Sequence, residues 1–235
     1  MSLRRAGTWL VAVVLLAVPI LAGCSGGSGG SGESASALLA RAKTTLDQAR
    51  TVHFVLDSTN PPTTGTALLG GTGDFLRPSS FQGTLQVLTG GNTVGLKVIS
   101  VAGTVYVQLP FVPTYSAVDP HQFGLGDPGA LLDPETGISQ LLAKADNAKA
   151  GDEKRVNGEV VREVTADLPG DLVQQLLTSK DPATPVQARF SVATGSGQLR
   201  RAVLTGPFFS AESNATYTIE LSDFGADVSI SAPPT

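Results

Sequence analysis

Residues 81–109 contain three neighbouring segments in which apolar residues recur at every second position. The segments are 81–89, 93–101 and 104–109, and Gly90-Gly91-Asn92 and Ala102-Gly103 lie between them. Short glycine-containing connections of this kind are typical of β-hairpins. Alternate residues of a strand share a face, which groups Leu85 with Val87, Leu96 with Val98, and Val105 with Val107. The pattern predicts an antiparallel meander with one covered, apolar face.

The segments on either side of this meander predict further strands and a few helices. Residues 37–50 carry apolar positions at spacings of three and four, which predicts an amphipathic helix capped by Ser34 or Ser36. Phe54 and Leu56 then share a face of a predicted strand over 52–57. The remaining predicted elements are a loop over 60–73 that leads into a second strand, strands over 151–156, 159–167, 186–193, 198–205, 215–224 and 226–230, and a short helix over 168–177. Together they predict an α+β fold, an antiparallel sheet with helices on one side.

A helix start is signalled at Asp133-Pro134-Glu135, which combines a capping residue, a proline at the first helical position and an acid in the first turn. Ile138, Leu141 and Leu142 continue it at helical spacing, and Ala145 and Ala148 extend the pattern. The preceding residues, 110–134, have little periodicity and are rich in Pro, Gly and aromatics. They predict a long loop with short helical turns, and loops of this length are often functional.

The N-terminus has the features of a secretory signal peptide. Arg4 and Arg5 precede an apolar run over 9–21, and Leu21-Ala22-Gly23-Cys24 follows. This last motif resembles the lipobox of a bacterial lipoprotein, in which the cysteine is lipidated and the chain is cut before it. A membrane-spanning helix would need about 20 apolar residues, which the run lacks. An ordinary signal peptide is the other alternative, but Cys24 is the only cysteine and has no disulfide partner.

The composition limits the partners that the mature chain can have. Sixteen Lys and Arg stand against twenty Asp and Glu, and loss of Arg4 and Arg5 changes the net charge from −4 to −6. This balance excludes a nucleic-acid-binding protein. Only 15% of residues are charged and 41% are apolar, where about 25% charged is usual. Either a thick hydrophobic core or an internal apolar surface would account for this excess of apolar residues over charged ones.

The motifs that would indicate catalysis or a cofactor are weak. Residues 124–129 match the Gly-x-Gly-x-x-Gly pattern, but Pro128 falls where the helix of a dinucleotide site would open. His53 and His121 are the only histidines and lack the clustered acids of a metal site. Residues 152–155, two acids followed by two bases, form a charged cluster that is most simply a solvated turn. We therefore predict a non-catalytic protein without cofactor or metal.

Several motifs resemble the LppX, LprG, LprF and LprA lipoproteins of mycobacteria, and the resemblance covers nearly all of the mature chain. The most specific is 132–142, similar to the family's Leu-Asp/Asn-Pro-x-x-Gly-Leu-x-x-Leu-Leu sequence. Val52-His53, Val156-Asn157-Gly158 and 221–225 also match. Phe190 and Phe224 stand where family members usually have tryptophan, and both remain large aromatics.

The resemblance implies one strongly curved antiparallel sheet, a half-barrel closed by helices around an apolar cavity, as in the LolA and LolB carriers. The cavity would hold acyl chains of diacyl or triacyl lipids and glycolipids, such as triacylglycerol, phosphatidylinositol mannosides or phthiocerol esters. The implied place is the outer, periplasmic face of the plasma membrane or the envelope surface. A major-facilitator transporter is an implied partner, and we expect a monomer.

The sequence motifs and the resemblance together divide the chain into parts. Residues 1–23 are the signal peptide, 24–32 the lipidated Cys24 with a Gly/Ser tether, 33–231 one lipid-binding domain and 232–235 a disordered tail. Leu85 falls at the family's cavity wall, and alternation and helical spacing add the other expected cavity residues: Phe54, Leu56, Val87, Leu96, Val98, Val105, Val107, Ile138, Leu141 and Leu142. The alternative is a structural or transporter-accessory lipoprotein whose sheet packs solidly on its helices. An esterase is a third.

Overall fold

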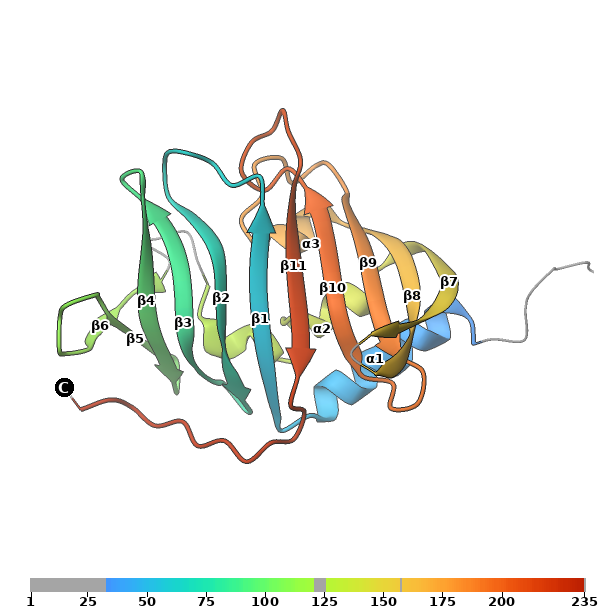
Figure 1. The fold of residues 1–235 in the computed structure, drawn as a ribbon, viewed down its shortest axis with the longest axis horizontal. Coiled ribbons are helices and arrows are strands. Elements are labelled where there is room, and N and C mark those ends of the chain that lie inside the picture. Colours follow the sequence, from blue (N-terminus) through green and yellow to red (C-terminus); the bar gives the residue numbers. More distant parts are fainter. Residues whose placement is uncertain (1–32, 121–125, 157, 235) are drawn as a thin grey trace, which may run out of the picture. The chain divides into compact units, whose positions relative to one another are not determined.

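The computed structural model describes residues 33–120, 126–156 and 158–234, and residues 33–235 form one compact unit (Figure 1). Several predictions lie outside the described residues. They concern the signal peptide 1–23, Cys24 with the tether, His121, the first two residues of the glycine pattern at 124–129, and Thr235. No helix of the described part is both long enough and apolar enough to cross a bilayer.

The described strands form one curved antiparallel sheet, as predicted, and this sheet is not closed. Its order is β6-β5-β4-β3-β2-β1-β11-β10-β9-β8-β7, so β6 and β7 are its edges. The strands are β1 (Thr51–Thr59), β2 (Ala67–Leu76), β3 (Ser80–Thr89), β4 (Asn92–Val101), β5 (Thr104–Gln108), β6 (Ser116–Val118), β7 (Asp146–Val156), β8 (Glu159–Leu168), β9 (Val186–Ala193), β10 (Leu199–Gly206) and β11 (Ala215–Ser222). The central pair, β1 with β11, joins two sequential meanders.

The predicted hairpin turns are confirmed. Thr89 pairs with Asn92, and Val101 pairs with Thr104, so each connection has two residues. Gly90 and Gly91 have φ of 56° and 77°, and Ala102 and Gly103 have 50° and 77°. Positive φ at both central positions defines the turn that matches the twist of the flanking strands. These turns set the register of β3, β4 and β5.

The helices lie on one face of the sheet (Figure 1). They are α1 (Ala35–Gln48), the 3₁₀ helix η2 (Pro128–Leu132), α2 (Ser139–Ala143) and α3 (Gly170–Gln174). The Ser34 hydroxyl accepts a hydrogen bond from the Ala37 amide, which confirms one of the two predicted caps. α1 packs against β7 to β10, whereas η2 packs against β2 to β4. The two halves of the sheet are therefore covered by different helices.

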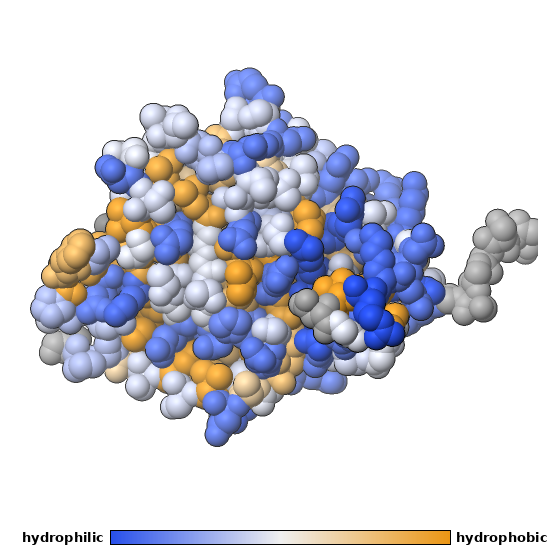
Figure 2. Space-filling model, viewed as in Figure 1, coloured by the Kyte–Doolittle hydropathy of each residue, from blue (hydrophilic) through white to orange (hydrophobic). Residues whose placement is uncertain are grey.

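Residues 152–155 are not a turn, because they lie in β7. Lys154 pairs with Glu163 at 2.6 Å, and Glu153 pairs with Arg162 at 3.0 Å, both across to β8. The side chains are exposed, so the prediction of a solvated charge cluster is right in exposure only. Figure 2 shows the resulting hydrophilic surface over β7 and β8. The charged side chains form ion pairs across two strands, where the sequence had predicted a turn.

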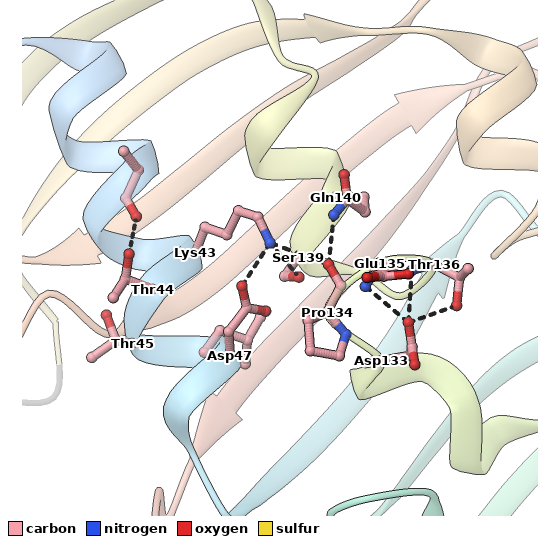
Figure 3. Close-up of polar contacts among 12 residues, drawn as sticks. Lys43, Thr44, Thr45, Asp47, Asp133, Pro134, Glu135, Thr136, Ser139 and Gln140 are labelled. Atoms are coloured by element: carbon pink, nitrogen blue, oxygen red, sulfur yellow. Dashed lines mark hydrogen bonds and ion pairs between the residues drawn. The ribbon is translucent and has the colours of Figure 1, made fainter.

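The helix predicted from Asp133 onward is much shorter than its pattern indicates. α2 covers only Ser139–Ala143, and Ala148 lies in β7, whose Asp146 pairs with Asp167 of β8. Asp133 accepts hydrogen bonds from the amides of Glu135 and Thr136 at 2.8 and 2.9 Å (Figure 3). These bonds hold the pKa of its carboxyl below the ordinary value. The capping residue thus closes a turn, and strand pairing overrides the helical pattern beyond Ala143.

The turn at 133–138 is fastened to α1. Lys43 Nζ pairs with Asp47 at 2.6 Å and donates to the Pro134 carbonyl at 3.2 Å and the Ser139 hydroxyl at 3.3 Å (Figure 3). Gln140 Nε2 donates to the same carbonyl. These bonds position α2 and the residue before it, Ile138.

Three further boundaries differ from prediction. β2 begins at Ala67, inside the predicted loop over 60–73, and its glycines are strand residues. β6 was not predicted and lies within 110–134. Residues 226–230 form no strand, and β11, the strand that they follow, is already paired on both sides, by β1 and β10. They run past the start of β1 instead, where Thr51 Oγ1 donates to the Ala226 carbonyl at 2.7 Å.

Candidate functional site

A pocket of about 800 Å³ lies against the half of the sheet formed by β1 to β6 and β11. Aliphatic and aromatic side chains form most of its wall, and Asp127 is the only charged residue among the described residues that line it. Strands β7 to β10 contribute nothing to this lining. In their half, α1 packs on the sheet instead, with Leu38 and Leu46 buried.

Ten of the eleven residues expected in a cavity line this pocket. They are Phe54, Leu56, Leu85, Val87, Leu96, Val98, Val105, Val107, Ile138 and Leu141. Leu142 does not line it and is 3% exposed in the core. It follows Leu141 on α2, and successive helical residues point about 100° apart. That these residues contact a lipid stays a prediction.

Sequence reasoning missed other parts of the wall. β11 contributes Ile219 and Leu221, β2 contributes Leu68 and Phe75, and the segment after α3 contributes Leu176 and Leu177. The alternation of Tyr217, Ile219 and Leu221 was visible. What could not be seen was that β11 pairs with β1, which places Leu221 opposite Phe54.

Three phenylalanines form one end of the wall. The ring centroid of Phe54 lies 5.0 Å from that of Phe75 and 5.7 Å from that of Phe81, and the last two are 5.2 Å apart. The rings are tilted, as aromatic pairs prefer. All three are buried and line the pocket.

One oxygen of the Asp127 carboxylate is bonded within the protein. This oxygen accepts hydrogen bonds from the Ser100 hydroxyl and from the Gly129 amide at 2.8 Å. It thereby caps η2, whose N-terminus favours a negative charge. Apart from this one carboxylate, the described lining carries no charge, so the pocket presents a largely apolar interior to a ligand.

A second, smaller pocket of about 270 Å³ adjoins the first. The two share Thr66, Leu68, Leu176 and Leu177 in their linings. Lys180 is the only charged residue among those that line the second pocket. We call the second pocket the annex: it continues the apolar space, and its lining includes one solvent-exposed lysine.

Tyr217 lines the annex and is itself buried in the core. Its hydroxyl donates to the Leu68 carbonyl at 2.5 Å, and burial raises its pKa above the ordinary value. Phe208 and Phe209 pack edge-on against its ring, with centroids at 4.9 and 5.5 Å. The wall here is fixed by packing and by one hydrogen bond.

The other face of the sheet carries a chain of polar side chains that resembles part of a catalytic triad. His53 Nδ1 lies 2.7 Å from Asp74 Oδ1, and His53 Nε2 lies 3.2 Å from the Thr72 hydroxyl. These residues alternate with pocket-lining Phe54 and Phe75, so they point away from the pocket. They cannot act on a molecule bound there. No cluster of metal-ligating side chains occurs within the described part.

Comparisons with known proteins agree with this architecture. Residues 34–230 match the model of the LppX_LprAFG lipoprotein family. The Lipoarabinomannan carrier protein LprG of Mycobacterium tuberculosis is 26% identical over 230 residues, covering 96% of this chain and 94% of that protein. The protein of the same name from Mycolicibacterium hassiacum is 27% identical over 239 residues, with 96% and 97% covered.

Two solved structures share the fold. LprF from Mycobacterium bovis has a TM-score of 0.71 at 18% identity and covers 86% of this chain and 97% of its own. Mycobacterium tuberculosis lipoprotein LppX has a TM-score of 0.63 at 18% identity and covers 84% and 98%. Since the family model spans most of the chain, the protein belongs to the LppX_LprAFG lipoprotein family.

Proposed function

We propose that this protein is a membrane-anchored lipid carrier that holds the acyl chains of its cargo in the apolar pocket. The observation that carries the proposal is a volume of about 800 Å³ whose described lining contains one charged residue, already bonded within the protein. This volume falls within the range of about 300–1,000 Å³ typical of ligand pockets. The relatives named as lipoarabinomannan carriers support the same activity.

The carrying step is non-covalent and needs no cofactor. An acyl chain in water costs about 0.8 kcal/mol for each exposed CH₂, and the pocket removes that cost as a bilayer does. Because the pocket and the bilayer are both apolar, the net preference between them is small. Transfer is then reversible, which a carrier requires.

The cargo that we propose is a diacyl or triacyl lipid or glycolipid, of the triacylglycerol, phosphatidylinositol mannoside or phthiocerol ester type. Cys24 would hold the monomeric protein at the outer face of the plasma membrane. From there it would pass cargo toward the outer envelope, with a major-facilitator transporter as the proposed partner. The Gly/Ser tether over 25–32 would span roughly 16 Å as a flexible coil.

The annex offers a place for the polar headgroup. Its lining joins that of the apolar pocket through four shared residues, and Lys180 brings one positive charge to it. An anionic headgroup there would meet the lysine while its acyl chains remain among apolar side chains. A phosphate-bearing lipid therefore fits this pair of pockets better than a neutral one.

Native mass spectrometry tests the proposal. The mature chain with Cys24→Ser would be expressed in a mycobacterial host, and co-purifying lipids would be extracted and identified. We expect about one diacyl or triacyl lipid per protein. A clean unliganded mass that persists after incubation with envelope lipids would contradict it and favour the structural or transporter-accessory alternative.

Replacing Lys180 tests the position of the headgroup. We expect Lys180→Ala to weaken binding of phosphatidylinositol about three- to tenfold at low salt, because a charge-assisted contact is lost. Binding of triacylglycerol should not change. Lys149→Ala is the matched control, since Lys149 is exposed on β7, far from both linings. Equal losses for the two lipids would show that Lys180 supports the wall and not the headgroup.

A further inference from the structure

The connection between β5 and β6 exposes apolar side chains in an unusual way. Phe111 is 106% exposed, Leu109 is 52% exposed and Val112 is 40% exposed, and these three are the large apolar residues of the described chain that stand out in solvent. We call residues 109–113 the apolar tip. Figure 2 shows hydrophobic surface at the corresponding edge, to the left of the view. A contiguous exposed group of this kind marks a surface that meets an apolar partner.

The backbone presents Phe111 at a conformational cost. Its φ is 66°, in the left-handed region that a bulky residue rarely adopts. The side chain receives no packing in return, since it is fully exposed. The tip is nevertheless held in shape, because the Val112 amide donates to the Leu109 carbonyl at 3.2 Å and Gln108 Nε2 donates to the Pro113 carbonyl at 2.9 Å. The Phe111 ring thus points into solvent from a turn that two hydrogen bonds stabilise.

The tip continues the wall of the large pocket. Leu109 and Val112 line that pocket as well as being exposed, so one apolar surface runs from the pocket to Phe111. Residues 108–118 contain no charged side chain. An acyl chain could pass along this surface without meeting a charge.

We propose that the apolar tip inserts into the surface of a lipid bilayer and joins the pocket to the acyl region during loading and release. This inference rests on the proposed function, because it supposes that the pocket takes lipid. A protein partner suits the tip less well. Stable protein interfaces bury about 1,000 Å² or more, far beyond three side chains, whereas single aromatic and aliphatic residues suffice at a membrane interface.

The position of the tip sets the orientation of the domain. β6 is one edge of the sheet, and α1 packs toward the other edge, on β7 to β10 (Figure 1). The apolar tip and α1 therefore lie toward opposite edges of the sheet. With the tip inserted, the β6 edge of the sheet faces the bilayer and the β7 edge lies away from the insertion point.

A tryptophan reporter tests the insertion. Trp9 is the only tryptophan of the sequence and lies in the predicted signal peptide, so Phe111→Trp gives the mature chain a single one. With residues 25–235 and phosphatidylcholine vesicles, we expect a blue shift of emission and quenching by brominated acyl chains. Ala150→Trp is the matched control, because Ala150 is exposed on the opposite edge strand. Its emission should not change.

The functional variant is Phe111→Asp, with Ala150→Asp as its control. We expect Phe111→Asp to slow lipid uptake from vesicles at least about tenfold, since the apolar contact of one aromatic side chain is lost. Its capacity for lipid delivered from detergent and its unfolding midpoint should stay unchanged. Uptake by the wild type should not depend on salt, because the tip is uncharged.

The outcomes separate this inference from the proposed function. If neither wild type nor variant takes lipid by either route, the proposed function fails. If wild type takes lipid and Phe111→Asp matches it from vesicles, only the inference fails. Unquenched emission from the Phe111→Trp variant, together with self-association that Phe111→Asp abolishes, would assign the tip to a second copy of the chain and overturn the bilayer assignment.

Discussion

Protein that carries Leu85→Trp together with Leu96→Trp is expected to bind at least about tenfold less lipid than wild type, with its fold intact. Leu85 of β3 pairs directly with Leu96 of β4, and both line the large pocket. Two indole rings side by side on that face would occupy space that acyl chains need. Because the rings extend into open volume, the overpacking cost of a filled core does not arise.

Leu85→Trp alone should give a smaller loss in the same direction, since one indole fills only part of about 800 Å³. The bound lipid would be counted by native mass spectrometry after incubation with envelope lipids. Folding would be followed by circular dichroism and urea unfolding.

Lys97→Trp is the matched control. Lys97 follows Leu96 on β4, is exposed, and points to the opposite face. We expect it to load lipid as wild type does. If the double variant bound as much lipid as wild type, the lipid would have to bind somewhere other than this pocket.

The six pocket residues of β3, β4 and β5 were predictable because their information is local. Alternation sets which side chains share a face, and two-residue turns such as Gly90-Gly91 set the register between neighbours. Phe54 and Leu56 followed from the same periodicity in β1. The antiparallel sheet could be inferred in the same way, strand by strand.

The pairing of β1 with β11 could not be inferred, because it joins distant parts of the chain. His53 lies opposite Ser222, and periodicity says nothing about which distant strand completes a sheet. That pairing brings Ile219 and Leu221 into the wall, so both were missed.

The prediction of a long helix after Asp133 was wrong for another reason. A cap followed by helical spacing satisfied every local rule, yet β7 gains its stability by pairing with β8 from Asp146 onward. Local propensity is a weak preference, and tertiary pairing overrides it. The same limit applies to the pocket volume, since periodicity identifies an apolar face but not the space left beside it.

Gly83→Ala is expected to lower the free energy of unfolding by about 3 kcal/mol, at the upper end for an overpacked site. Gly83 of β3 pairs with Gly73 of β2, and the buried ring of Phe81 lies across them. A Cβ at Gly83 would lie 2.7 Å from Phe81 Cζ and 2.8 Å from Gly73 Cα, and it would also clash with the Thr72 carbonyl oxygen. Two of these neighbours are backbone atoms, so a rotamer change cannot relieve the contact.

Gly95→Ala is the control that separates this clash from a general effect of glycine in strands. Gly95 lies in the adjoining strand β4, and a Cβ there would meet only the side-chain amide of Gln86, at 3.2 Å. That amide is exposed and can move, so alanine should be neutral or stabilise by about 0.4–1 kcal/mol through the unfolded chain. Urea unfolding of the two variants measures both changes. If Gly83→Ala were as stable as Gly95→Ala, Phe81 could not be packed on paired glycines, and the aromatic end of the pocket would have to be built differently.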